Sequence, residues 1–145
     1  MVSEQYPKAL GTTVPEVAEV LPEGAVVVAK TRFSMLVPEI VQALDALPAK
    51  VKKILIVGIE THVCVLQTTL DLIEKGYEVH ILVDGVSSQR LTDRATALRR
   101  LSQSGAFMAT SEMVMFQMMV ETAHPSFKAI SALCKEARPE QLPAV

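Results

Sequence analysis

The sequence has few of the features that mark disulfide-stabilised or metal-binding proteins. Only two cysteines, Cys64 and Cys134, occur in 145 residues, and the three histidines are scattered along the chain. Two distant cysteines make no disulfide framework in a chain long enough to build its own core. The histidines lack the paired spacing of a zinc site. We therefore expect reduced thiols and neither a bound metal nor another cofactor.

Long hydrophobic runs and blocks of like charge are also missing. The longest apolar runs, at 25–29 and 54–57, are far shorter than the ~20 residues of a membrane-spanning helix. The formal net charge is -2 with mixed signs, which favours neither nucleic acid nor an anionic membrane as a partner. The first seven residues resemble neither a signal nor a transit peptide. We expect a cytoplasmic protein with a small-molecule substrate, although targeting to an organelle stays open.

Short β-branched runs alternate with longer amphipathic segments, which is the pattern of βα units around a mostly parallel sheet. Uniformly apolar strands predict helices on both faces, so the fold class is α/β, a three-layer α/β/α, Rossmann-like arrangement. We expect one domain over 1–138 and a flexible tail over 139–145. The predicted strands are 25–29, 53–57, 78–83 and 107–110, and the predicted helices are 38–47, 61–75, 92–103, 111–122 and 125–137.

The residues that follow the predicted strands are the first place to look for a site. Ligands of parallel sheets bind in the crevice outside the carboxyl ends of the strands. Lys30, 58–64, 84–88 and 110–112 therefore share one rim of the predicted sheet.

Cys64 has the setting of an activated nucleophile. A glycine turn at Gly58 leads from a buried strand and places the thiol in the first turn of a helix, whose free N–H groups and dipole favour a thiolate. The same N–H groups suit an oxyanion. Lys30, from a neighbouring predicted strand, would add a positive charge beside the sulfur and favour the thiolate further.

Structural readings of the same residues also stand. A cysteine in an amphipathic helix is more often a packing residue, and a lysine that ends a strand is ordinarily solvated. His62 is a poor base for Cys64, because residues two apart on a helix do not face each other. Asp84 and Ser88 fit turn and capping chemistry as well as ligand binding. Cys134 lies among apolar residues of the last predicted helix and is interpreted as structural.

Five separate motifs, in order, resemble the isochorismatase-like cysteine hydrolases, and in particular the branch of isochorismatase domain-containing proteins. Together they cover nearly the whole chain and favour a catalytic role for Cys64. The motifs are 4–11 (EQYPKALG), 30–35 (KTRFSM), 58–64 (GIETHVC), 84–88 and 110–112.

The resemblance implies a catalytic Asp, Lys and Cys set that hydrolyses a C–N or C–O bond of a small molecule. Cys64 would be the nucleophile, Lys30 would stabilise charge beside it, and the Asp would accept a proton. The backbone N–H groups of Glu60 and Cys64 would form the oxyanion hole. The family commonly has a cis peptide bond where Ile59 meets Glu60. The resemblance also suggests a homo-oligomer.

The chain departs from the family pattern at its start. The family Asp ends the first strand of the fold, whereas Met1 matches a position near the end of the second strand. The first strand and its helix have no counterpart here, so the fold is expected in an N-terminally truncated form. Family membership favours an enzyme, and activity without the Asp stays open. Losing a strand uncovers backbone groups and the apolar face of its neighbour, which favours oligomerisation. The metal-binding Asp and His set of the nicotinamidase branch is not seen.

Three other functions compete with this one. A non-catalytic interaction module that keeps the fold and assembles through its C-terminal helices gains weight from the missing Asp. Another α/β protein with a reactive cysteine, such as the deglycase-like group, is disfavoured by the motifs at 6–8 and 30–33. A dinucleotide-binding domain is disfavoured because no Gly-x-Gly-x-x-Gly turn follows a strand.

Overall fold

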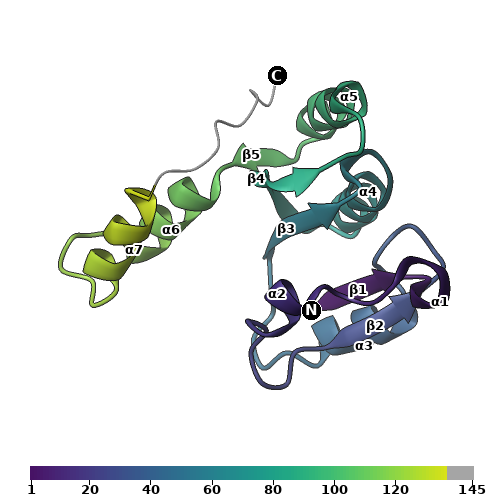
Figure 1. Ribbon diagram of the computed structural model, residues 1–145, viewed down its shortest axis with the longest axis horizontal. Coiled ribbons are helices and arrows are strands. Elements are labelled where there is room, and N and C mark those ends of the chain that lie inside the picture. The colour runs from purple at the N-terminus through teal and green to yellow at the C-terminus, as the bar shows by residue number, and fades with distance from the viewer. Residues whose placement is uncertain (137–145) are drawn as a thin grey trace.

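The computed structural model describes residues 1–136 and contains five strands in two parallel sheets. Figure 1 shows the two-stranded sheet below the three-stranded sheet. The smaller sheet pairs β1 with β2, and the larger has the order β3-β4-β5. The strands are β1 (Val2–Gln5), β2 (Val27–Lys30), β3 (Lys53–Ile59), β4 (Glu78–Ser87) and β5 (Phe107–Ala109).

Helices connect the strands in the manner of βα units. Proline opens α1, α2 and α3 at the first helical positions, where its fixed φ suits the helix and its missing N–H costs nothing. The helices are α1 (Pro7–Leu10), α2 (Pro15–Ala18), α3 (Pro38–Asp45), the π-helical turn η1 (Thr61–Val65) that continues into α4 (Leu66–Glu74), α5 (Leu91–Gln103), α6 (Ser111–Met119) and α7 (Phe127–Cys134).

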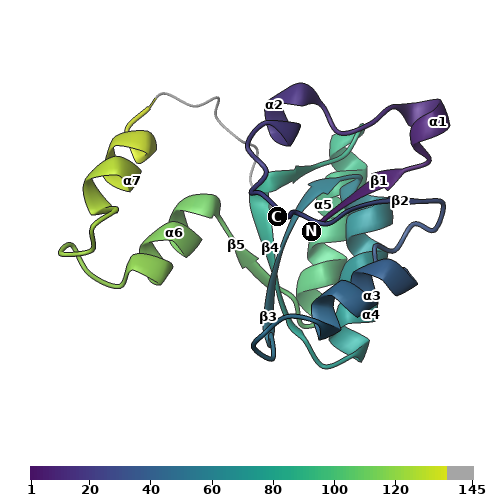
Figure 2. The same cartoon turned by 90° about the horizontal axis from the view of Figure 1, so that it is seen from below.

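The core lies between the sheets and one layer of helices. Alternate residues of β4, Val79 and Ile81, are fully buried and pack with Leu72 of α4 and with Leu98 and Leu101 of α5. Figure 2 shows α3, α4 and α5 on the same side of the strands. The opposite face of β3 carries apolar side chains that are exposed, and we call the surface of Leu55, Val57 and Ile59 the open face.

Strand β4 holds the larger sheet together, because it pairs with β3 on one edge and with β5 on the other. Its register with β3 shifts after Ile56, and pairing resumes at Gly58 with Val86. The buried side chain of Arg94 from α5 donates to the carbonyl oxygens of Val83 and Val86 and so satisfies backbone groups at this irregularity.

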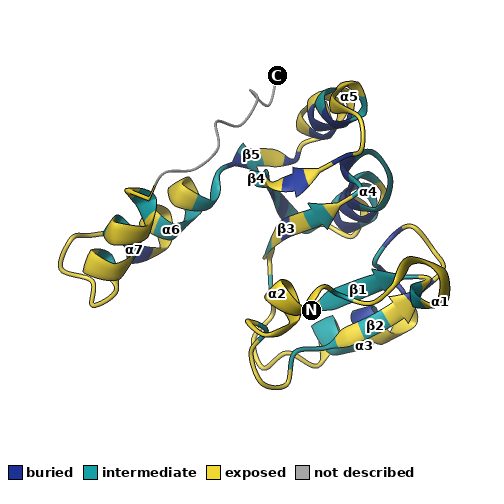
Figure 3. Cartoon of the chain, viewed as in Figure 1, coloured by how far each residue is buried: buried dark blue, intermediate teal, exposed yellow. Residues whose placement is uncertain are grey.

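The edges of β1 and β3 that face away from their partners have no paired strand among the described residues. The strands of both sheets run in the same direction (Figure 1). The carboxyl ends of β1 and β2 lie close to the turn that follows β3, where Gln5, Lys30 and Cys64 are in contact. Helices α6 and α7 project from the end of β5 (Figures 1 and 2). Exposed residues cover much of this arm (Figure 3), among them Met113, Met118 and Val120.

The predicted α/β class with parallel strands is confirmed, and the arrangement is consistent with a three-layer α/β/α fold. Several predicted boundaries were wrong, most of all in three elements. The strand predicted over 78–83 runs to Ser87, because β4 pairs again with β3 at Val86 and Ser87. The helix predicted to Thr122 ends at Met119, where Val120 takes a positive φ of 67°. The predicted final helix is shorter at both ends.

Three short elements at the start of the chain, β1, α1 and α2, were not predicted from periodicity, because each has only four residues. The whole tail predicted over 139–145, and the last two residues of the predicted domain, lie outside the described residues. In residues 1–136 no helix combines the length and apolar character needed to cross a membrane.

Candidate functional site

Lys30 ends β2 with its side chain buried, 6% exposed, at the carboxyl edge of the smaller sheet. Its Nζ donates to Oε1 of Gln5 at 2.5 Å, to the carbonyl oxygen of Arg32 at 2.9 Å and to that of Phe33 at 3.0 Å. Three acceptors match the three N–H groups of an ammonium. The loop after β2 therefore folds back to hold the amine in place.

Cys64 lies in η1, directly after β3, and its sulfur meets the Lys30 amine. Nζ of Lys30 is 3.8 Å from Sγ of Cys64, and Sγ is 3.9 Å from Oε1 of Gln5. The structure thus brings together the two side chains proposed from the sequence. Lys30 comes from the end of β2 in the smaller sheet, and Cys64 comes from the turn after β3 of the larger sheet. An ammonium beside a thiol favours the thiolate, which is the nucleophilic form.

The backbone at Glu60 turns sharply between β3 and η1. The peptide bond between Ile59 and Glu60 is cis, as the family resemblance implied. The carbonyl oxygen of Glu60 accepts the N–H groups of Val63 at 3.1 Å and Val65 at 3.2 Å. The N–H of Cys64 falls between these two donors in the sequence and makes no such bond to Glu60.

Two carboxylates of the predicted rim, those of Glu60 and Asp84, have other partners. Oε2 of Glu60 accepts the backbone N–H of Gln89 at 2.8 Å and lies 3.8 Å from Nδ1 of His62. Asp84 accepts the backbone N–H of Ser111 at 2.8 and 3.0 Å, and also its hydroxyl, at the start of α6. Neither residue contacts Lys30, so neither takes the position of a proton acceptor between Lys30 and Cys64.

Lys30 has no ion-pair partner among the ion pairs found in residues 1–136. Its contacts are neutral carbonyl, amide and thiol groups. A buried charge is ordinarily paired with an opposite charge or with several strong acceptors. The positive charge is therefore available to a thiolate or to a bound anion.

Gln5 was missed as an individual site residue by sequence reasoning, although it lies in the EQYPKALG motif. It is the last residue of β1, in register with Lys30 of β2, and the N–H of Tyr6 donates to the carbonyl of Lys30 at 2.7 Å. Tyr6 takes a left-handed φ of 41°, which ends the strand at this point. The signal was available in the motif, but a four-residue strand is too short to be found from periodicity.

The residue before Gln5 fastens the loop that follows β1. The carboxylate of Glu4 accepts the backbone N–H of Thr13 at 2.7 Å and its hydroxyl at 2.8 Å. These donors hold the pKa of Glu4 below its ordinary value, since hydrogen bonds to a carboxylate favour its charged form. The loop containing α1 is thus tied back to the strand that carries Gln5.

The ring of His62 contacts the residues that follow β4. Its Nδ1 lies 3.0 Å from the hydroxyl of Ser88, and the buried hydroxyl of Thr61 donates to the carbonyl of Ser87 at 2.8 Å. These bonds join η1 to the end of β4. His62 therefore has a partner other than Cys64, in agreement with the helical spacing.

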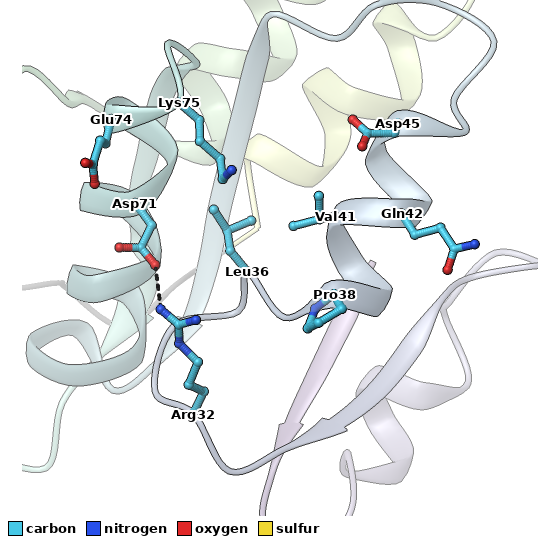
Figure 4. Close-up of a pocket in the computed structure, with 9 residues that line it drawn as sticks. All are labelled: Arg32, Leu36, Pro38, Val41, Gln42, Asp45, Asp71, Glu74 and Lys75. Carbon is cyan, nitrogen blue, oxygen red and sulfur yellow. Dashed lines mark ion pairs between the residues drawn. The ribbon is translucent and has the colours of Figure 1, made fainter.

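A surface pocket lies between α3 and α4, and Arg32 and Leu36 of the loop that follows β2 help to line it (Figure 4). Arg32 and Asp71 form an ion pair at 3.7 Å across its wall. Neither Cys64 nor Lys30 lines this pocket, so it is not the cavity of the candidate site. Residues 1–136 hold no group of three or more His, Cys, Asp or Glu side chains arranged to bind a metal ion.

Comparison with known proteins identifies the family. The Isochorismatase domain matches residues 3–113, which is most of the chain. The chain belongs to the isochorismatase domain family. It is 47% identical over 140 residues to human isochorismatase domain-containing protein 2, a match that covers 97% of this chain and 66% of the relative.

Solved structures of other proteins share the fold of this chain. The MAR1 ribonuclease of Caenorhabditis elegans is 44% identical, with a TM-score of 0.87 over 96% of this chain and 71% of that one. The YcaC gene product of Escherichia coli, named as an octameric hydrolase of unknown specificity, shares the fold at 23% identity, with a TM-score of 0.75 over 91% of this chain and 71% of that one. The isochorismatase domain described here spans between about half and two thirds of the length of its curated relatives.

Proposed function

We propose that the chain carries the cysteine part of an isochorismatase-like hydrolase site, in which Cys64 is the nucleophile and Lys30 stabilises its thiolate. The observation that carries the proposal is the 3.8 Å approach of the Lys30 ammonium to the sulfur, with no carboxylate paired to this ammonium in residues 1–136. A thiol next to a fixed positive charge is the usual form of an activated cysteine.

The proposed reaction breaks a C–N or C–O bond of a small molecule. Sγ of Cys64 forms a bond to the electrophilic carbon, and the leaving group departs with a proton. Water then displaces the sulfur and restores the thiol. The backbone N–H groups of Glu60 and Cys64 would hold the negative oxygen that develops during both steps.

The proton acceptor of this reaction is not found among the described contacts of the site. In the family the acceptor is an Asp, and both Glu60 and Asp84 are engaged elsewhere. We propose that the chain is inactive or turns over slowly unless such a carboxylate is supplied to the site.

We do not propose a ribonuclease activity for this chain. The term ribonuclease belongs to the name of the Caenorhabditis elegans protein. A chain with a net charge of -2 offers little of the phosphate-binding surface on which affinity for nucleic acid depends. We propose a small-molecule substrate and a cytoplasmic location.

Exposed apolar surface favours a second candidate, a non-catalytic module that assembles with copies of itself. The open face and the arm of α6 and α7 both present apolar side chains to solvent. Large exposed apolar patches usually mark interaction sites, and a protein of the same fold is named as an octamer. In this alternative Cys64 is a packing residue.

The rate of alkylation of Cys64 by iodoacetamide separates the two candidates. We expect the hydrolase site to react rapidly near neutral pH, and Lys30→Met to slow alkylation about tenfold at pH 7, because the positive charge that favours the thiolate is lost. Mass spectrometry reads each thiol separately, and Cys134 serves as the internal reference.

The matched control is Lys75→Met, which removes a lysine from the exposed end of α4. It should leave the rate of Cys64 unchanged. If Cys64 reacts no faster than Cys134, and if Lys30→Met leaves the alkylation rate of Cys64 unchanged, the hydrolase proposal is wrong and the assembly module is favoured.

A further inference from the structure

Gln5 contacts both members of the Lys30–Cys64 pair. Its Oε1 accepts a hydrogen bond from Nζ of Lys30 at 2.5 Å and lies 3.9 Å from Sγ of Cys64. Its Nε2 donates to the carbonyl oxygen of Thr31 at 2.8 Å. One side chain therefore joins the end of β1, the end of β2 and the start of η1.

The orientation of the Gln5 amide is determined by its partners. Lys30 offers only N–H donors and the carbonyl of Thr31 offers only an acceptor, so the amide oxygen must face Lys30 and the nitrogen must face Thr31. Rotating the amide by 180° would place two donors together and two acceptors together. The oxygen is thus held toward both the ammonium and the sulfur.

The backbone fixes the place from which Gln5 reaches the site. Gln5 and Lys30 are partners in the parallel register of β1 and β2, so their side chains emerge on the same face of the smaller sheet. The left-handed Tyr6 ends β1 immediately afterwards, and Pro7 begins α1. Gln5 is therefore the last extended residue before the chain turns away.

We propose that Gln5 is a positioning residue, whose neutral amide directs the Lys30 ammonium at Cys64 without cancelling its charge. The proposal rests on the function proposed above. An amide oxygen is a strong acceptor that carries no net charge, so the ammonium keeps its full field at the sulfur. A carboxylate in the same place would pair with Lys30 at 2.5 Å and put a negative charge near a thiolate 3.9 Å away.

The charge at position 5 can be tested by replacing Gln5 with Glu in the full chain. Iodoacetamide alkylation of Cys64 is followed from pH 5 to pH 10 in low salt, with mass spectrometry to distinguish Cys64 from Cys134. We expect the midpoint of the Cys64 profile to move upward by about one pH unit or more, because a neighbouring negative charge disfavours the thiolate. The Cys134 profile should not move.

Two further variants keep the test decisive. Gln42→Glu makes the same change of charge on exposed α3 and should leave the Cys64 profile unchanged. Gln5→Met keeps the length of the side chain but accepts no hydrogen bond from Lys30, and it should move the midpoint upward by less than Gln5→Glu does. It also replaces Gln5→Glu if that variant does not fold, as judged by circular dichroism.

The outcomes separate the two proposals. If Lys30→Met moves the Cys64 profile but neither folded Gln5 variant does, Gln5 has no positioning role and the proposal is wrong. If Lys30→Met also leaves the profile unchanged, the hydrolase function itself fails. A purely structural role for Gln5 would lower the unfolding midpoint in urea without moving the pH profile, and this result would also overturn the proposal.

Discussion

The two faces of strand β3 are both largely apolar but have opposite surroundings. Ile56 points into the core and is 9% exposed, whereas Leu55, Val57 and Ile59 are 46%, 60% and 68% exposed. The buried face is covered by α3, α4 and α5 (Figure 2). The residues of β3 therefore suit a strand that is covered on both faces. The described residues cover mainly one of them.

The largest expected effect comes from the buried face. Leu98 of α5 is fully buried, and Leu98→Ala should lower the free energy of unfolding by about 2–5 kcal/mol through lost burial and a residual cavity. The same substitution on the open face, Leu55→Ala, should cost less than about 1 kcal/mol. Urea unfolding followed by circular dichroism measures both.

This matched pair can fail in an informative way. Equal losses for Leu98→Ala and Leu55→Ala would mean that the open face is covered in solution, for example by another copy of the chain. Repeating the unfolding at a tenfold lower protein concentration would reveal such an association, because the stability of an oligomer depends on concentration.

A smaller effect is expected when the open face is made more polar. The double variant Leu55→Thr with Val57→Thr keeps residues that favour strands and removes apolar surface, so it should reduce self-association while changing the free energy of unfolding little. Light scattering against protein concentration measures this. The control Val20→Thr changes an exposed valine outside the open face and should leave the scattering unchanged. Equal scattering by the double variant and the parent would show that association uses another surface.

The smallest effect is expected at the polar end of the same face. Lys53 and His80 donate to the carboxylate of Glu78 at 2.9 and 2.8 Å, and these bonds, Lys53 first, hold the pKa of Glu78 below its ordinary value of 4.5. A carboxylate with a lowered pKa contributes stability above its unfolded pKa and loses it as the pH falls through the folded pKa.

Glu78→Gln should therefore unfold at slightly lower urea concentration than the parent at pH 7, and the difference should shrink below about pH 4.5. The measurement is the urea midpoint at pH 7, 5 and 3.5, as long as both proteins are folded. A difference that stays constant across this range would mean that Glu78 acts through packing and not through its charge.

Much of the fold could be predicted from the sequence, because β3, β4 and the helices between them are long and periodic. What escaped prediction depended on pairing between distant residues. Strand β4 continues past Asp84 because Val86 and Ser87 find partners on β3 again. Strand β1 has four residues and is ordered by its parallel pairing with β2, which no local pattern reports.

The candidate site divides in the same way. Lys30 and Cys64 each follow a predicted strand, so the rule that parallel strands present their carboxyl ends at one edge placed them near each other. Gln5 had no predicted strand to place it. The π-helical form of η1 was also missed, because it depends on the turn at Glu60 and not on the helical spacing of the residues that follow.

The arm of α6 and α7 has a consequence for the ageing of the protein. Met113 and Met118 are 58% and 73% exposed on α6, whereas Met119 on the same helix is buried. Peroxide converts exposed thioethers to polar sulfoxides, a change that reductases reverse. Oxidation of methionine should therefore begin on the projecting arm and leave the packed core intact. The sulfoxide content of α6 then reports the exposure of the protein to oxidants.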